Sequence, residues 1–182
     1  MNMGLVLNNK TAGVLLGLIL LSGNSVHAQS AAEYLRDGND SLTHGYYDKA
    51  ISEFTKAIDM NPNLAKAYDN RGVAYAQEGS YDRAIADFTI AIANNSKDPE
   101  ALNNRGHAYA IQGNLTQAIH DYTKAIESNA FYVKAYNNRE IAYYKLEKYD
   151  KAWADVHTAE AIGGAVDPRF IEDLKKASGK DN

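Results

Sequence analysis

The chain has 182 residues, a formal net charge of −4 and no cysteine. The absence of cysteine excludes disulfides, thiol catalysis and a lipid-modified N-terminal cysteine. The acidic balance argues against nucleic acid as a partner, because nucleic-acid-binding proteins present a basic face.

Residues 1–28 have the composition of a secretory signal peptide. Lys10 is their single charge, Ala12–Leu21 is an almost unbroken apolar run, and the small residues Val26 and Ala28 occupy the positions that a signal peptidase reads. The run is about half the length that crosses a bilayer, which makes a retained anchor the weaker interpretation. We therefore predict cleavage after Ala28, a periplasmic or secreted protein, and no stable membrane insertion after cleavage.

The remaining chain repeats itself four times with a period of 34 residues. Each unit carries one alanine with large residues three positions before and four positions after it; the alanines are Ala50, Ala84, Ala118 and Ala152. This period and this alternation of small and large residues are typical of stacked helical hairpins. We predict units at 31–64, 65–98, 99–132 and 133–166, each made of two antiparallel helices.

Glycines mark two positions in the first three units. A left-handed turn glycine is expected between the helices, and a mid-helix glycine allows the partner helix to approach closely. The two sets are Gly45, Gly79 and Gly113 at the turns, and Gly38, Gly72 and Gly106 within the first helices. In the fourth unit Glu147 and Glu140 take these places, and a buried Glu140 without a partner would be costly. We expect either a splayed fourth hairpin or a cation that reaches Glu140.

The units resemble tetratricopeptide repeats over essentially the whole mature chain. The second unit fills the key positions of that family best, with Tyr68, Gly72, Tyr75, Ala84, Phe88 and Ala91. The resemblance implies an all-α fold: a right-handed α-α superhelix (solenoid) of four helix hairpins within residues 29–177. Asp167-Pro168 reads as an N-cap and first helical residue, so a capping helix is expected at 168–177. Residues 178–182 are predicted to be a disordered tail.

Charged residues also recur once per unit. Arginine stands at Arg71, Arg105 and Arg139, and the acidic positions are Glu53, Asp87, Asp121 and Asp155. The first unit keeps Glu53 but has Asp37 where the arginine would be, so we predict pairing between successive units. The predicted structural pairs are Glu53 with Arg71, Asp87 with Arg105, and Asp121 with Arg139.

One asparagine per unit, at Asn70, Asn104 and Asn138, is predicted to lie on the concave face, which the first helices line. An asparagine amide both donates and accepts, so a ladder of asparagines suits an extended peptide backbone. The resemblance implies this use, because a similar ladder holds the bound polypeptide in some tetratricopeptide superhelices. The alternative is that these side chains bond neighbouring helix ends. Other residues expected on this face are Asn39, Lys66, Asp69, Val73, Gln77, Asn103, His107, Ile111, Lys134, Asn137, Ile141, Tyr144 and Lys145.

Chaperone-binding members of the family hold a C-terminal carboxylate with a basic clamp. The matching positions here are Leu35, Asn39, Asn70, Glu100 and Asn104. The clamp is therefore not expected, because its basic residues are missing and Glu100 would repel a carboxylate.

No motif in the mature chain indicates catalysis. Its histidines lack metal-ligand spacing, and no phosphate loop or nucleophile elbow occurs. We predict no enzyme activity, no cofactor and no metal. The predicted function is a protein–protein interaction scaffold in a cell-envelope assembly. A self-associating homo-oligomer and a non-catalytic accessory subunit of an envelope enzyme are the alternatives.

Overall fold

The computed structural model describes residues 30–180, so the predicted signal peptide and its cleavage site lie outside the described residues. Within this range the chain forms helices and no strand. The first helix (residues 30–43) pairs with α2 (Tyr47–Met60). The later hairpins are α3 (Ala65–Gln77) with α4 (Tyr81–Asn94), α5 (Pro99–Ile111) with α6 (Leu115–Ser128), and α7 (Val133–Lys145) with α8 (Tyr149–Ala161). A last helix, α9 (Pro168–Ser178), follows them.

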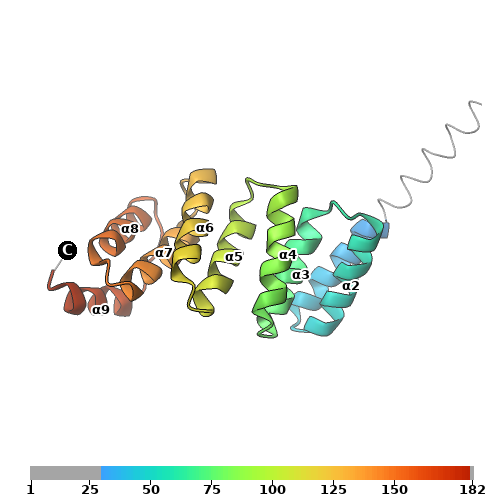
Figure 1. Cartoon of the computed structure of the whole chain (residues 1–182), viewed down its shortest axis with the longest axis horizontal. Coiled ribbons are helices and arrows are strands. Elements are labelled where there is room, and N and C mark those ends of the chain that lie inside the picture. The colour runs from blue at the N-terminus through green and yellow to red at the C-terminus, as the bar shows by residue number, and fades with distance from the viewer. Residues whose placement is uncertain (1–29, 181–182) are drawn as a thin grey trace, which may run out of the picture.

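The helices stand side by side in chain order along the long axis of the molecule (Figure 1). Each packs mainly on its neighbours in sequence, and α5 also contacts both α3 and α7. Among the described helices, the second helices of successive hairpins have at most marginal contact with one another. The first helices are therefore the more closely spaced row and form the inner side of the stack. The all-α solenoid predicted from the sequence is confirmed.

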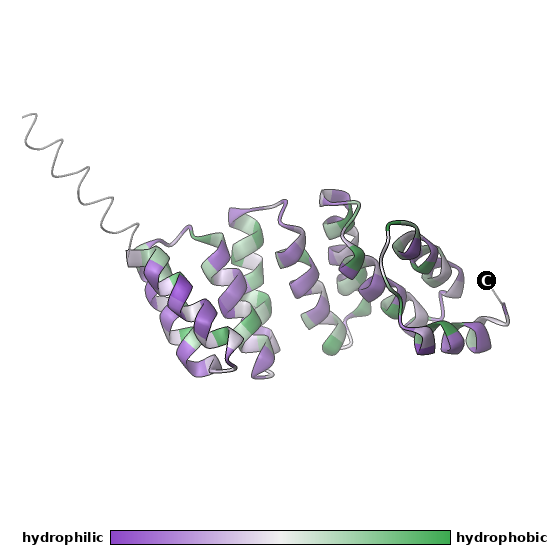
Figure 2. Cartoon of the chain, turned by 180° about the vertical axis from the view of Figure 1, so that it is seen from behind, coloured by the Kyte–Doolittle hydropathy of each residue, from purple (hydrophilic) through white to green (hydrophobic). Residues whose placement is uncertain are grey.

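Each helix carries both apolar and polar residues (Figure 2), as expected where one side packs and the other meets solvent. The turns within the hairpins adopt the predicted left-handed backbone. The φ angles are 76° at Gly45, 78° at Gly79 and 81° at Gly113. In the fourth hairpin Glu147 takes this place with a φ of 57°, and among the described residues it is the one non-glycine residue with a positive φ. The fourth hairpin therefore keeps the left-handed turn without glycine, the residue that favours it.

In the first three hairpins, an aromatic ring packs directly on the backbone of the mid-helix glycine. A Cβ atom added at Gly38 would lie 2.5 Å from the Phe54 ring, and one at Gly72 would lie 2.7 Å from the Phe88 ring. Tyr122 lies equally close to Gly106. These rings are at most 1% exposed, so glycine is required at these positions by lack of space.

In the fourth hairpin the larger side chain is on the first helix and the smaller one is on the second helix. Glu140 stands at the glycine position and is 2% exposed, while Val156 replaces the aromatic ring and is 1% exposed. The smaller valine leaves room for the glutamate, which explains why the hairpin closes. Within residues 30–180 no cation reaches the carboxyl group, and its Oε2 atom has no hydrogen-bond partner. Burial raises the pKa of Glu140 to about 8, and the nearby carboxylates of Asp155 and Glu160 add to the shift.

The arginines pair within their own hairpin, so the predicted pairing of Glu53 with Arg71, Asp87 with Arg105, and Asp121 with Arg139 is wrong. Arg71 Nε lies 2.7 Å from Asp87 Oδ2, and Arg71 Nη2 lies 2.9 Å from Asp87 Oδ1. Arg105 binds Asp121, and Arg139 binds Asp155, in the same two-pronged way. Packing of the first helix against the second brings these side chains face to face. Glu53 instead pairs with Lys56, at 3.0 Å.

The link between hairpins comes from the third nitrogen of the same arginine. Arg71 Nη1 donates to Thr55 Oγ1 of the preceding hairpin at 3.0 Å. Arg105 reaches Thr89 at 3.2 Å, and Arg139 reaches Thr123 at 2.9 Å. The arginines thus do join successive units, as expected, but through a hydroxyl group rather than a carboxylate.

The last helix covers the end of the stack. Leu174 of α9 is fully buried, in a cluster with Trp153 and Val156. The expected tail begins later than residue 178: Ser178 is the last residue of α9, and its Oγ accepts a hydrogen bond from Trp153 Nε1 at 3.2 Å. Lys180 forms an ion pair with Asp150. Residues 181–182 lie outside the described residues.

We predict that double-mutant cycles will separate the two pairings of Arg105. The coupling free energy between Arg105→Met and Asp121→Ala should be roughly 2 kcal/mol or more, because each single change leaves a buried charge without its partner. The coupling between Arg105→Met and Asp87→Ala should stay within about 0.5 kcal/mol. Unfolding in urea gives all the required values, with Arg36→Met in the exposed Arg36–Asp37 pair as a control. Equal coupling in both cycles would contradict the pairing described here.

We also predict that Glu140 makes stability depend on pH. The unfolded chain loses this proton near pH 4.5 and the folded chain near pH 8, so the folded state holds the extra proton between these values. Stability should therefore fall as the pH rises through this window. Glu140→Gln removes this loss and should be more stable than wild type at about pH 8, by roughly 2 to 4 kcal/mol.

Urea unfolding across this pH range measures the effect. The exposed Glu172→Gln substitution is the control, and its curve should follow that of the wild type. If the Glu140→Gln curve also runs parallel to the wild-type curve, the carboxyl group is not buried as described.

Candidate functional site

The asparagine ladder lies on the inner row of helices and joins neighbouring units. Asn104 Nδ2 of α5 donates to Asp69 Oδ1 of α3 at 3.1 Å. Asn138 Nδ2 of α7 donates to Asn103 Oδ1 of α5 at 2.8 Å. The acceptors Asp69 and Asn103 are buried, at 1% and 6% exposed. Each ladder amide is therefore held in one orientation by the preceding hairpin.

Asn70 follows a different register because its expected acceptor is missing. The residue that corresponds to Asp69 in the first unit is Leu35, which cannot accept a hydrogen bond. Asn70 Nδ2 instead donates to Asn39 Oδ1, one helical turn further along the first helix. The inter-helix bond is thus retained at all three ladder positions.

These contacts are compatible with both interpretations of the asparagine ladder, peptide binding and bonding between neighbouring units. The asparagines do bond neighbouring units, between the middles of the helices rather than at their ends. That bond uses only one amide proton, and within residues 30–180 no donor reaches the amide oxygens of Asn70, Asn104 and Asn138. Each amide keeps one acceptor and one further donor for an external group.

A network of ion pairs lies on the inner face around α3 and α5. Lys66 Nζ lies 3.0 Å from Asp69 Oδ2 and 2.7 Å from Glu100 Oε2. Burial opposes the positive charge, but the bonds to Glu100 and Asp69 outweigh it and raise the pKa of Lys66. Burial also raises the pKa of Asp69, although Lys66 counteracts that shift. Glu100 is thus part of a salt bridge at a position where a carboxylate clamp needs a base.

Two residues predicted for the binding face have structural roles instead. Asn137 Nδ2 donates to the backbone oxygen of Ala165 at 2.9 Å, which anchors the loop before α9. The Tyr144 ring lies 5.6 Å from Phe170 of α9 and 5.9 Å from Tyr149, between ring centres. Asn137 and Tyr144 therefore hold the capping helix, and we correct their assignment as peptide-binding residues.

Other predicted residues surround a pocket between α5 and α7. His107 and Ile111 of α5 and Asn138, Ile141 and Lys145 of α7 line a space of about 140 Å³. Leu115 and Tyr122 of α6 also line it, and these two were not expected at the site. The sequence did contain one signal for this part of the pocket, because Leu115 stands where the other three units carry tyrosine. Val73, at the position of His107 in the preceding unit, is half-buried in a hydrophobic cluster.

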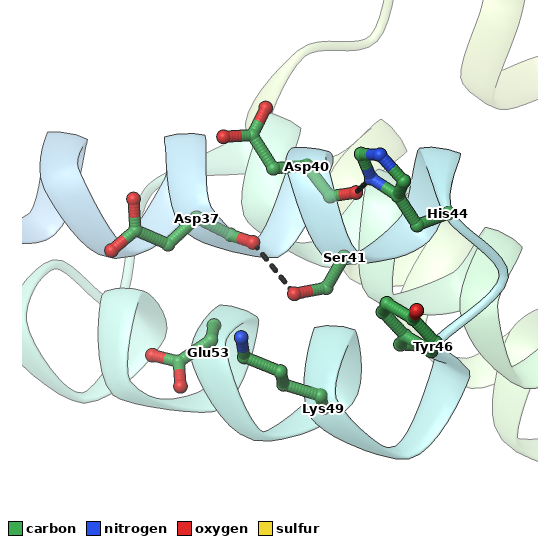
Figure 3. A pocket seen from close by; sticks show the side chains of 7 residues that line it. All are labelled: Asp37, Asp40, Ser41, His44, Tyr46, Lys49 and Glu53. Atoms are coloured by element: carbon green, nitrogen blue, oxygen red, sulfur yellow. Dashed lines mark hydrogen bonds between the residues drawn. The ribbon is translucent and has the colours of Figure 1, made fainter.

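A second hollow lies between the first helix and α2, beside the turn that joins them (Figure 3), with a volume of about 380 Å³. Asp37, Asp40 and His44 of the first helix and Lys49 and Glu53 of α2 line it. The hydrogen bonds drawn there are local, since Ser41 Oγ donates to the backbone oxygen of Asp37 at 2.9 Å and His44 Nδ1 contacts the backbone oxygen of Asp40 at 2.7 Å. Its mixed charges face solvent without converging on one point, so we place the candidate site on the inner face.

Residues 30–180 contain no cluster of His, Asp or Glu side chains placed to hold a metal ion. None of the helices described is both long and apolar enough to cross a membrane.

A family model described as "Tetratricopeptide repeat" matches residues 35–99 and 70–133. Together the two matches span more than half of the chain. Three solved structures illustrate the similarity. MamA has a TM-score of 0.72 at 23% identity, over 84% of this chain and 85% of that chain. PilF of Pseudomonas aeruginosa has a TM-score of 0.75 at 19% identity, over 84% and 71%. The first tetratricopeptide domain of Spaghetti (RPAP3), bound to the HSP90 peptide SRMEEVD, has a TM-score of 0.64 at 28% identity, over 65% and 94%.

Proposed function

Because this chain belongs to the tetratricopeptide repeat family, we propose that it is a non-catalytic scaffold that binds an extended segment of a partner protein on its inner face. One observation carries the proposal. The ladder amides of Asn70, Asn104 and Asn138 are oriented by the preceding hairpin, and their oxygens accept no hydrogen bond within residues 30–180. Oriented polar groups with free capacity are what a bound polypeptide backbone requires.

The chemistry of this interaction follows from the amide group. A peptide in an extended conformation exposes N–H and C=O groups along its length. Each ladder oxygen can accept from a peptide N–H, and the second proton on each Nδ2 can donate to a peptide C=O. Such contacts hold a backbone without reading its side chains, so preference for one partner has to come from the residues beside the ladder.

The comparisons support peptide binding at the level of the family. The RPAP3 domain, 28% identical to this chain, is bound to an HSP90 peptide in its structure. The positions of the carboxylate clamp carry Leu35 and Glu100 here, and Glu100 pairs with Lys66. We therefore propose a different partner for this chain, held along its backbone and not by a C-terminal carboxylate.

We further propose that the protein acts in the cell envelope after export. The proposal rests on residues 1–28 alone, with their apolar run and the small residues Val26 and Ala28. The predicted partner is then a component of an envelope assembly.

Site-specific photocrosslinking tests the binding face. A photoreactive residue in place of Gln77, the exposed last residue of α3, should capture a partner from envelope extract. The same residue in place of Ile90, which is 40% exposed on α4, should capture little, because α4 is a second helix and lies outside the inner row. Capture at Ile90 alone would place the interface on the outer face and overturn the proposal.

The ladder itself is tested by replacing Asn70, Asn104 and Asn138 together with alanine. We expect loss of the captured partner, because each substitution removes an acceptor and a donor that no neighbour replaces. Asn137→Ala is the matched control, since Asn137 is also an amide on α7 but bonds Ala165. Circular dichroism and thermal unfolding should verify that both variants remain folded. Undiminished capture by the folded triple variant would restrict the ladder to a structural role.

The export proposal predicts one mature N-terminus. When the full chain is produced in a bacterium with an outer membrane, mass spectrometry of the periplasmic fraction should find a protein that begins at Gln29. Replacing Ala28 with a bulky charged residue should leave a longer, unprocessed chain, because the peptidase reads a small residue there. An uncleaved wild-type chain in the cytoplasm would contradict export.

A further inference from the structure

The pocket between α5 and α7 owes its existence to one residue. Leu115 stands where the other units carry Tyr47, Tyr81 and Tyr149. In the preceding unit Tyr81 packs beside Val73 and Ala76 against a core of Ala84, Phe88 and Ala108. These neighbours correspond, one repeat later, to the residues around the pocket. The shorter leucine leaves a space there of about 140 Å³.

The pocket is suited to an apolar side chain. Ile111 and Ile141, on its rim, are 49% and 41% exposed, unusually high for large apolar residues. Tyr122 beneath them is 1% exposed and belongs to the core. A cavity of about 150 Å³ lined by apolar groups holds a molecule the size of benzene. The space therefore fits one leucine, methionine or phenylalanine side chain.

A positive charge stands beside the pocket without a partner in the described chain. Lys145 is exposed and, within residues 30–180, forms no ion pair, whereas Lys66 on α3 has two carboxylates within 3.0 Å. Burial, and then the charge of Lys145, lower the pKa of His107. This shift favours the neutral imidazole, so Lys145 supplies the positive charge beside the pocket. A carboxylate is the complementary group.

A polar group for the peptide backbone lies in the same place. Asn138 lines the pocket, and its Nδ2 is fixed on Asn103 Oδ1 at 2.8 Å. Its amide oxygen remains available to a peptide N–H beside the pocket. An apolar space, a cation and an oriented amide thus meet within one stretch of the inner face.

We propose that this pocket is the specificity site of the groove, and that it receives one large apolar side chain of a partner peptide with an aspartate or glutamate adjacent to it. Asn138 holds the backbone of this residue pair, Leu115 leaves the space for the apolar side chain, and Lys145 pairs with the acid. This inference rests on the proposed function, because it assumes an extended polypeptide on the inner face.

The first test uses random short peptides displayed on phage and selected against the mature protein. Enriched sequences should share a leucine, methionine or phenylalanine next to an acidic residue. Synthetic versions with both ends blocked, measured by fluorescence anisotropy, exclude binding through a terminal carboxylate. Enrichment of sequences without this pair, or no enrichment, would overturn the proposal.

Leu115→Tyr is the decisive variant, because it fills the pocket with the residue that the other three units already carry. It should fold as wild type does and weaken the selected peptides by about tenfold or more, the expected effect of excluding one apolar side chain. Leu115→Met keeps the volume and should preserve binding. Equal affinity for wild type and a folded Leu115→Tyr variant would exclude the pocket as the site.

A second comparison isolates the charge. Changing the acidic residue of a selected peptide to its amide should weaken binding to wild type but have little effect on Lys145→Gln. Lys134→Gln, on the same helix, is the control and should behave as wild type. An acid preference that persists in Lys145→Gln would remove Lys145 from the proposal.

Two further outcomes separate this inference from the proposed function. If Leu115→Tyr still captures the partner through the photoreactive residue at position 77, the groove binds its partner without the pocket, and only the present inference fails. If sedimentation shows wild type as a dimer and Leu115→Tyr as a monomer, the occupant is a second copy of this chain, which also overturns the proposed peptide partner.

Discussion

The stack depends on a single arginine in each of the last three repeats that binds two hairpins at once. Arg105 grips Asp121 in its own hairpin with two nitrogens and donates with the third to Thr89 of the preceding one. Thr89 in turn donates to the backbone oxygen of Ile85 at 2.7 Å. A charged group this far from solvent is stable only when its donors are satisfied. The same side chain therefore closes one hairpin and sets the position of the next.

The first and the fourth of the described hairpins each lack part of this link. The first unit carries Asp37 in place of the arginine, and no described hairpin precedes it to offer a threonine. In the fourth unit His157 replaces the threonine and stacks on Trp153, with 5.5 Å between the ring centres. There α9 covers the hairpin with Leu174 instead of an arginine. Both departures from the repeat pattern thus lie in the outermost of the described hairpins.

Other departures divide the inner face into two chemically different halves. Around α3 and α5 Lys66 is bound by both Asp69 and Glu100, and the face offers mainly amide groups. Between α5 and α7 a leucine replaces a tyrosine, and Lys145 remains without a partner among the described residues. Uniform repeats can hold a backbone, but only such differences between them can distinguish one partner from another. Selectivity is therefore expected where the repeats are least alike.

The sequence by itself determined the hairpins, their turns and the capping helix, because alanine and glycine spacing, left-handed turn residues and Asp-Pro caps act over a few neighbouring residues. It did not determine which carboxylate meets each arginine. Asp87 and Glu53 lie at similar sequence distances from Arg71, and only the packing of the first helix on the second makes Asp87 its partner. The recurrence of Asn138 was evident, but its fixed orientation depends on Asn103 of another hairpin. The sequence likewise showed Leu115 in place of a tyrosine. Whether the neighbours would close over the missing ring was decided by helix packing, which left the pocket open.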